Sequence, residues 1–329
     1  MTRPPDTSLR VVALGGGHGL FATLSALRQI TESVTAVVTV ADDGGSSGRL
    51  RGELGILPPG DLRMALAALA SHDAEHARWS TVFQHRFSGD GALAGHAVGN
   101  LLLAGLIDVL GDPVLALDEA CRLLGVRGRV LPMSEHPVTI EADVTGLDAD
   151  PEQVRLIRGQ VAVASTPGRV RRVWLEPRQP QACAHAVAAV EQADAVLLGP
   201  GSWFTSVLPH LLVPGLQRAL QHTAARRIVV LNLAPQPGET AGFSPEQHLD
   251  VLSQHAPALR IDAVVADTSA VPVPERLRRA AGDLGGQAYL APVAAADGSP
   301  RHDPGALAAA LRGVLRWPTG APAQSRGGR

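Results

Sequence analysis

Lysine is absent from this chain, whose 29 basic residues are all arginine. A Walker-type P-loop places a lysine on the nucleotide phosphates, and Schiff-base or pyridoxal phosphate chemistry needs a lysine amine. The sequence therefore excludes both. Any phosphate that the protein binds must be held by backbone N–H groups, helix N-termini, arginine or a metal ion.

Aromatic residues, cysteine, net charge and long apolar runs are also scarce. With four Trp, five Phe, one Tyr and a formal net charge of -2, the 329 residues offer neither a stacking platform nor a basic surface for nucleic acid. Cys121 and Cys183 lack the spacing of a thiolate metal site or a disulfide framework. No apolar run approaches the roughly 20 residues that span a bilayer, and no signal region opens the chain. We therefore expect a cytoplasmic protein that binds neither nucleic acid nor membrane.

Short β-branched runs alternate with amphipathic helical patterns along most of the chain. The runs at 9–15 and 34–42 flank a leucine-rich helical pattern at 20–30, the order of a right-handed βαβ unit. Further strand patterns occur at 194–199, 226–233, 261–267 and 287–293, and further helical patterns at 61–70, 97–110 and 115–124. This alternation predicts a single α/β domain over 9–315, a three-layer, Rossmann-like fold with an open, mostly parallel sheet.

Two segments depart from this rhythm. Between about 127 and 177 apolar and polar residues alternate with a period of two, which predicts a small antiparallel β insertion. Residues 316–329 are rich in Gly, Pro and polar residues, and we expect a disordered tail there.

A glycine-rich turn follows the first strand and precedes the first helix. It consists of Gly15, Gly16, Gly17, His18 and Gly19. Glycines in this setting let backbone amides approach a phosphate at a helix N-terminus. The dinucleotide fingerprint is matched only in part, because its third glycine position is Leu20. The turn therefore favours a phosphate ligand, and the broken fingerprint disfavours an NAD-dependent oxidoreductase.

Two aspartates close the second strand pattern and lead into another Gly/Ser-rich segment. Asp42 and Asp43 suit either a ribose hydroxyl or Mg²⁺ held together with phosphate oxygens. They are followed by Gly44, Gly45, Ser46, Ser47, Gly48 and Arg49. We expect this run to form a second anion-binding loop, whose neutral and cationic donors suit a phosphate or a sugar.

Polar residues also stand at the starts of two helical patterns. Asp61 is the expected N-cap of the 61–70 helix, and Arg63 in the first turn opposes the helix dipole unless it reaches an anion. His96 and Asn100 lie at the start of the 97–110 helix. His96 is a candidate general acid or base, and a structural cap is the alternative reading.

A third glycine-rich turn follows the strand pattern at 194–199. Its donors are Gly199, Gly201, Ser202, Thr205 and Ser206, and Asn232 follows the next strand pattern. Since ligands bind outside the carboxyl ends of parallel strands in open α/β sheets, we expect these turns to converge on one crevice.

Six segments carry a family resemblance, in order over residues 9–315. They are GGGHG at 15–19, VTVADDGGSSGRLRGELGILPPGDLR at 38–63, GHAVGNLLLAGL at 95–106, GPGSWFTSVLPHLL at 199–212, NLAPQPGETAGFS at 232–244 and RHDP at 301–304. Together they resemble the gluconeogenesis-factor family (YvcK-type), within the superfamily of 2-phospho-L-lactate transferase (CofD-like). The resemblance implies a CofD-like Rossmann-type fold and binding of UDP-sugars such as UDP-GlcNAc. It also implies a role in cell shape and cell-wall metabolism on gluconeogenic carbon sources.

The resemblance also assigns residues. It places nucleotide-sugar contacts at 15–19, 42–47 and 199–206, with Asn232 nearby, and it matches Arg301 to the family's late arginine associated with UDP-sugar binding. His18 stands where many members have threonine.

Two hypotheses follow. The first is a regulatory protein that binds a UDP-sugar, forms a homodimer and is read by a cell-wall or morphogenesis protein. The alternative is a transferase acting on a nucleotide-linked phosphate, with Mg²⁺ on Asp42 or Asp43 and His96 as acid or base.

Overall fold

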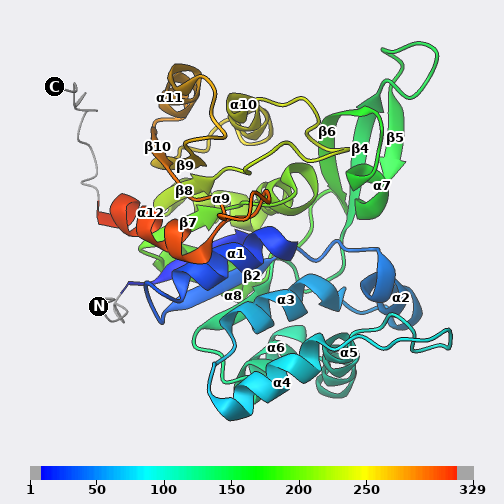
Figure 1. Cartoon of the computed structure of the whole chain (residues 1–329). Coiled ribbons are helices and arrows are strands. Elements are labelled where there is room, and N and C mark those ends of the chain that lie inside the picture. Colours follow the sequence, from blue (N-terminus) through cyan, green and yellow to red (C-terminus); the bar gives the residue numbers. More distant parts are fainter. Residues whose placement is uncertain (1–8, 317–329) are drawn as a thin grey trace.

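The computed structural model describes residues 9–316 and is built on a seven-stranded parallel sheet (Figure 1). The strand order is β10-β9-β8-β7-β1-β2-β3. The strands are β1 (Val11–Gly15), β2 (Val34–Val38), β3 (Arg129–Pro132), β7 (Ala195–Leu198), β8 (Arg226–Val230), β9 (Ala263–Asp267) and β10 (Gln287–Ala291). Every residue of β1, β7 and β9 is buried, as expected for parallel strands covered on both faces. The predicted fold class is confirmed.

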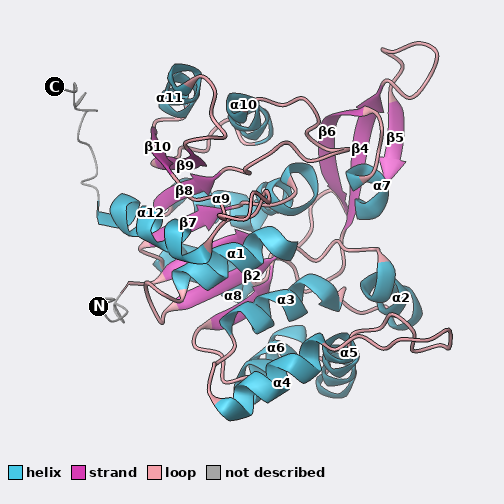
Figure 2. Ribbon diagram, in the orientation of Figure 1, coloured by secondary structure: helices cyan, strands magenta, loops and turns pink. Residues whose placement is uncertain are grey.

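Helices cover both faces of this sheet (Figure 2). The chain runs from β1 to β2 in one direction and from β7 to β10 in the other, so right-handed crossovers place the connecting helices on opposite faces. On one face, α1 (Gly17–Leu27) packs against α3 (Pro59–Leu69) and α12 (Pro304–Arg316). The other face carries α8 (Ala184–Gln192), α9 (Pro214–His222), α10 (Pro245–His255) and α11 (Pro274–Asp283).

A helical lobe extends the chain between β2 and β3. It contains α2 (Gly45–Leu54), α4 (Ala74–Gln84), α5 (Val98–Leu110) and α6 (Pro113–Leu123) in addition to α3. The Gly/Ser-rich run that we expected to form a loop is the first part of α2, so this expectation was wrong. Glycine at position 45 starts the helix with a φ of +48°, and the helix amides that follow are left without a side-chain cap.

The small antiparallel sheet stands apart from the main one. It has the order β5-β4-β6, with β4 (Thr139–Thr145), β5 (Arg155–Arg158) and β6 (Arg169–Glu176), and α7 (Gln160–Ala164) lies between β5 and β6 in the chain. Within the range predicted as an insertion, β3 instead pairs parallel with β2. A four-residue edge strand that begins with an arginine has too few residues to show the apolar run of a buried parallel strand.

The chain ends lie beyond the described part. The tail predicted for 316–329 falls outside the described residues except for Arg316, which closes α12. Within residues 9–316 no helix is both long enough and apolar enough to cross a bilayer.

Candidate functional site

The strand order places a topological switch point at the carboxyl ends of β1 and β7. Here neighbouring strands lead their chains away in opposite directions, and this switch point is where open α/β sheets bind ligands. The turn at 15–19 follows β1 and the turn at 199–206 follows β7. A Cβ on Gly19 would lie 2.2 Å from the Pro200 carbonyl oxygen, so the two turns are in backbone contact. The expected convergence of these two turns is therefore present.

The amino end of α1 already holds a carboxylate of the protein itself. The Asp61 carboxyl group accepts a hydrogen bond from the Gly17 N–H. A Cβ on Gly16 would lie 2.5 Å from Asp61 Oδ2, so a larger residue there would displace that carboxylate. His18 in the same turn is exposed. The position expected to take a ligand phosphate is thus occupied by Asp61 in this conformation.

Asp61 is electrostatically unusual. Burial and, next, the nearby Asp42 carboxylate raise the pKa of Asp61 to about 7, and the Gly17 hydrogen bond opposes this shift only in part. The first helical residue of α3 is Pro59 and its N-cap is Pro58. Asp61 therefore lies in the first turn and is not the N-cap that we predicted.

The two adjacent aspartates accept hydrogen bonds from different segments of the chain. Asp42 Oδ1 accepts a hydrogen bond from the Gly44 N–H at 2.9 Å, whereas Asp43 Oδ1 accepts one from the Val161 N–H of α7 at 3.0 Å. In residues 9–316 no three His, Cys, Asp or Glu side chains gather as a metal site. Mg²⁺ bound with phosphate oxygens needs only one or two protein carboxylates, and the fold brings Asp42 toward Asp61.

The donors of the third turn are also bound internally. Asn232 Oδ1 accepts from the Gly201 N–H, and its Nδ2 donates to the Gly201 carbonyl, both at 2.8 Å. The buried Glu239 carboxylate accepts from the Phe204 N–H at 3.1 Å and from the Thr205 hydroxyl at 2.5 Å. Burial raises the pKa of Glu239. The sequence analysis assigned no role to Glu239, although this residue lies in the quoted segment 232–244.

Glu239 therefore anchors the short π-helical turn Trp203–Val207. We expect Glu239→Ala to lower the free energy of unfolding by about 2 kcal/mol, because buried donors of the turn lose their acceptor. Urea unfolding monitored by circular dichroism measures this. The matched variant Glu275→Ala, at an exposed position of α11, should change stability by less than about 0.5 kcal/mol. Equal effects of the two substitutions would contradict the anchoring role.

A buried hydrogen-bond network joins α2, α3 and α5. Arg63 Nε donates to Asn100 Oδ1, Asn100 Nδ2 donates to Ser46 Oγ, and Ser46 Oγ lies next to His96 Nδ1, each at 2.9 Å. Burial, assisted by Arg49, lowers the pKa of His96 and favours its neutral form. In the tautomer that carries its proton on Nε2, neutral His96 accepts a hydrogen bond from the Ser46 hydroxyl at Nδ1. His96 therefore lies beside a hydroxyl group, and its role as an acid or base stays a prediction.

Ser47 faces the other way from Ser46. Its hydroxyl oxygen accepts from the Gly60 N–H at 3.0 Å and so ties α2 to the amino end of α3. One region beside the switch point thus gathers the predicted residues of three segments, 42–49, 61–63 and 96–100.

Comparison with known proteins shows the family of this chain. The family model described as "2-phospho-L-lactate transferase CofD" matches residues 11–293. A curated protein of Mycobacterium tuberculosis (strain ATCC 25618 / H37Rv) is 63% identical over 315 residues, covering 94% of this chain and 92% of the relative. A protein of Bacillus subtilis (strain 168), named gluconeogenesis factor, is 38% identical over 263 residues, covering 80% of each chain. The chain belongs to the gluconeogenesis-factor family, within the CofD family.

The solved structure of a UPF0052 family member from Bacillus halodurans has the same fold. Its TM-score is 0.83 at 33% identity, and the match covers 92% of this chain and 99% of that one. The family resemblance drawn from the six sequence segments is confirmed.

Among the residues assigned through the family, Arg301 lies farther from the switch point. It belongs to the loop between β10 and α12, and its exposed guanidinium donates to Asp297 at 2.6 Å and to Ser299 at 2.9 Å. Asp267, at the carboxyl end of β9, holds this loop by accepting the Val293 and Ala294 N–H groups. Arg301 thus lies at the same edge of the sheet as the switch point, but it follows β10, which β8 and β9 separate from β7.

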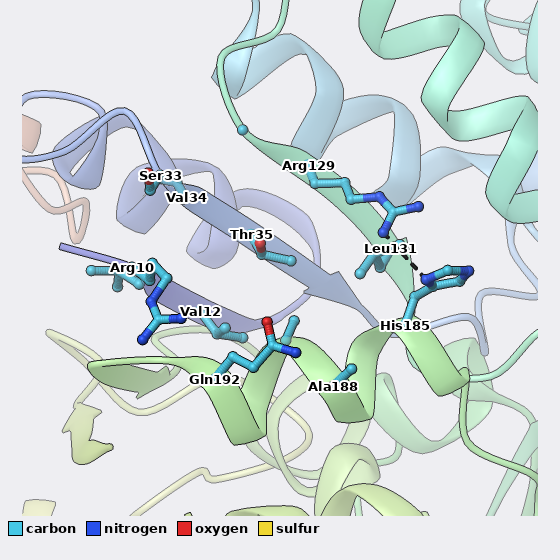
Figure 3. Close-up of a pocket in the computed structure, with 13 residues that line it drawn as sticks. Arg10, Val12, Ser33, Val34, Thr35, Arg129, Leu131, His185, Ala188 and Gln192 are labelled. Atoms are coloured by element: carbon cyan, nitrogen blue, oxygen red, sulfur yellow. Dashed lines mark hydrogen bonds between the residues drawn. The ribbon is translucent and has the colours of Figure 1, made fainter. Parts of the chain in front are cut away.

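A hollow of about 470 Å³ lies at the opposite, amino ends of β1, β2 and β3 (Figure 3). Its two arginines have carboxylate partners: Arg129 makes a bidentate pair with Asp118, and Arg10 pairs with Asp194. Because these charges are compensated and the hollow lies at the amino ends of the strands, it is not the candidate ligand site.

Proposed function

We propose that the protein is a cytoplasmic, nucleotide-sugar-binding regulatory protein that takes a ligand of the UDP-GlcNAc type. Its role would be in cell shape and cell-wall metabolism during gluconeogenic growth. The observation that carries the proposal is the meeting of the amino ends of α1, α2 and α3 beside the switch point between β1 and β7, in a chain of the gluconeogenesis-factor family. Three helix dipoles that converge on one region favour a polyanionic ligand. A homodimer and a protein partner of the cell-wall or morphogenesis machinery go with this proposal.

A regulatory role agrees with the internal carboxylates. Asp61 and Glu239 hold the turns at 15–19 and 199–206 in a closed set of hydrogen bonds before any ligand arrives. A ligand that competes for those donors would rearrange the turns. The rearrangement would change a surface that a partner protein can bind.

Calorimetric titration with UDP-GlcNAc, GDP and NAD, each with and without Mg²⁺, tests the proposal. We expect saturable heat with UDP-GlcNAc and none with NAD, because the fingerprint glycine is replaced by Leu20. The absence of heat with UDP-GlcNAc would contradict the proposal. Chromatography of the titrated mixture distinguishes the transferase alternative, since release of uridine nucleotide would show turnover and unchanged ligand would support a regulatory protein.

A further inference from the structure

A cavity of about 640 Å³ opens between the amino end of α2 and the segment 86–95. Gly45, Ser46 and Arg49 line it from α2, and Arg86 lines it from the segment before α5. Asp43 stands at its rim, with one carboxylate oxygen held by the Val161 N–H. Ser46, the hydrogen-bond partner of His96, therefore lies next to open space.

The two arginines of this cavity form no ion pair. Arg49 Nη2 donates to the Ala94 carbonyl at 2.6 Å and Arg86 Nη1 donates to the Gly95 carbonyl at 2.5 Å. Across residues 9–316 no carboxylate lies within 4.0 Å of either guanidinium. Carbonyl groups orient a guanidinium without neutralising it, so both side chains keep donors and charge for an anion.

A third arginine behind the cavity is buried. Arg63 is 6% exposed, and among residues 9–316 it forms no ion pair within 4.0 Å. Burial and, next, the neighbouring charge of Arg86 lower the pKa of Arg63, and the Asp61 carboxylate opposes this shift in part. A buried cation is normally paired, because the desolvation cost of an unpaired charge is several kcal/mol. An anion in the cavity would relieve the repulsion between Arg63 and Arg86.

The backbone supplies further donors at this place. The N-cap of α2 is Gly44, which offers no side-chain acceptor to the amides of the first turn. By contrast, Asp61 binds the first turn of α1, and Glu239 binds the turn after β7. The amino end of α2 is therefore the one of these three whose amides have no side-chain acceptor, and it lies beside a cavity.

We propose that this cavity binds the diphosphate of the nucleotide sugar, with Arg49, Arg86 and the first amides of α2 as direct contacts. Arg63 is a positioning residue, which acts on the cavity through Asn100 and Ser46. This inference rests on the proposed function, and it places the charged part of the ligand beside α2 instead of on the turn at 15–19. A guanidinium fork matches phosphate oxygens and needs no lysine.

The test is calorimetry on the full chain with two probes, UDP-GlcNAc and inorganic pyrophosphate. Arg86→Gln and Arg49→Gln should each weaken the binding of both probes roughly tenfold to a hundredfold, the loss expected for a hydrogen bond to a charged group. The melting temperature should stay within about 2 °C of the wild type, because both side chains are exposed. Arg278→Gln, an exposed arginine of α11 paired with Glu275, is the matched control and should bind like the wild type.

The outcomes separate this inference from the proposed function. If both arginine variants bind the two probes as the wild type does, the inference is wrong while UDP-sugar binding stands. If pyrophosphate binds and the variants weaken it, but UDP-GlcNAc gives no heat, the anion site stands and the nucleotide-sugar proposal fails. If neither probe binds the wild type, both are overturned. Weakening by Arg301→Ala alone, with Arg86→Gln unchanged, would also overturn the inference.

Discussion

Gly19→Ala is expected to lower the free energy of unfolding by about 3 kcal/mol. A Cβ at this position would lie 2.2 Å from the Pro200 carbonyl oxygen and 2.6 Å from the Gly201 Cα. Both obstacles are backbone atoms, so the strain cannot be relieved by a rotamer change and the two turns must separate. The same separation would disturb the two turns at the switch point. We therefore expect the affinity for UDP-GlcNAc to fall together with the stability.

Urea unfolding and a UDP-GlcNAc titration of the same variant measure the two effects. Gly105→Ala is the matched control, because Gly105 lies inside α5 and a Cβ there meets nothing within 4 Å. That control should raise stability by up to about 1 kcal/mol, the helix preference of alanine over glycine. A Gly19→Ala variant as stable as the wild type would show that the two turns are not packed as described.

Asp61→Asn should remove a pH dependence of stability worth up to about 4 kcal/mol. In the native protein the pKa of Asp61 is raised to about 7, whereas in the unfolded chain the carboxyl group has its ordinary value near 4. Between these two values the native state binds a proton that the unfolded state has released. Stability from Asp61 is therefore full below about pH 4 and falls as the pH rises to 7.

The measured quantity is the difference between wild type and variant. His210 and His302 contribute with the opposite sign, because burial lowers the pKa of each to about 4 and the unfolded chain takes up their protons first as the pH falls. Denaturant titrations at pH 4, 6 and 8 should therefore show Asp61→Asn gaining stability relative to the wild type as the pH rises. Asp108→Asn, exposed on α5, is the control. A constant difference across the three pH values would contradict the assignment.

The sheet could be predicted because its strands are buried on both faces. The residues of β1 and β7 form unbroken apolar runs that end at a glycine. Such runs can be recognised from the sequence alone, without knowledge of the neighbouring strands. The helix α5 begins and ends within one residue of its prediction, since its apolar run stops at Gly111 in the left-handed conformation. The positions of these strands and of α5 are therefore determined by the local sequence.

The α2 helix and the internal carboxylates could not be predicted in this way. The sequence of α2, GSSGRLRGEL, contains three glycines and two serines, which are poor helix formers, and tertiary contacts such as the Ser47–Gly60 hydrogen bond decide its conformation. The hydrogen bond that the Thr205 hydroxyl donates to Glu239 joins the segment after β7 to the segment after β8. No period or motif records such a contact, and the same holds for the approach of Arg86 to Arg63.

The strand order also determines when the site can form during folding. The β1–β2 pairing closes a short segment, Val11 beside Val34, whereas the β1–β7 pairing sets Val11 beside Ala195. Closing the longer loop costs more entropy, and contacts of large sequence separation slow folding. The N-terminal βαβ unit can therefore assemble before the C-terminal strands dock, and competence to bind a ligand at the switch point arrives only with that late docking.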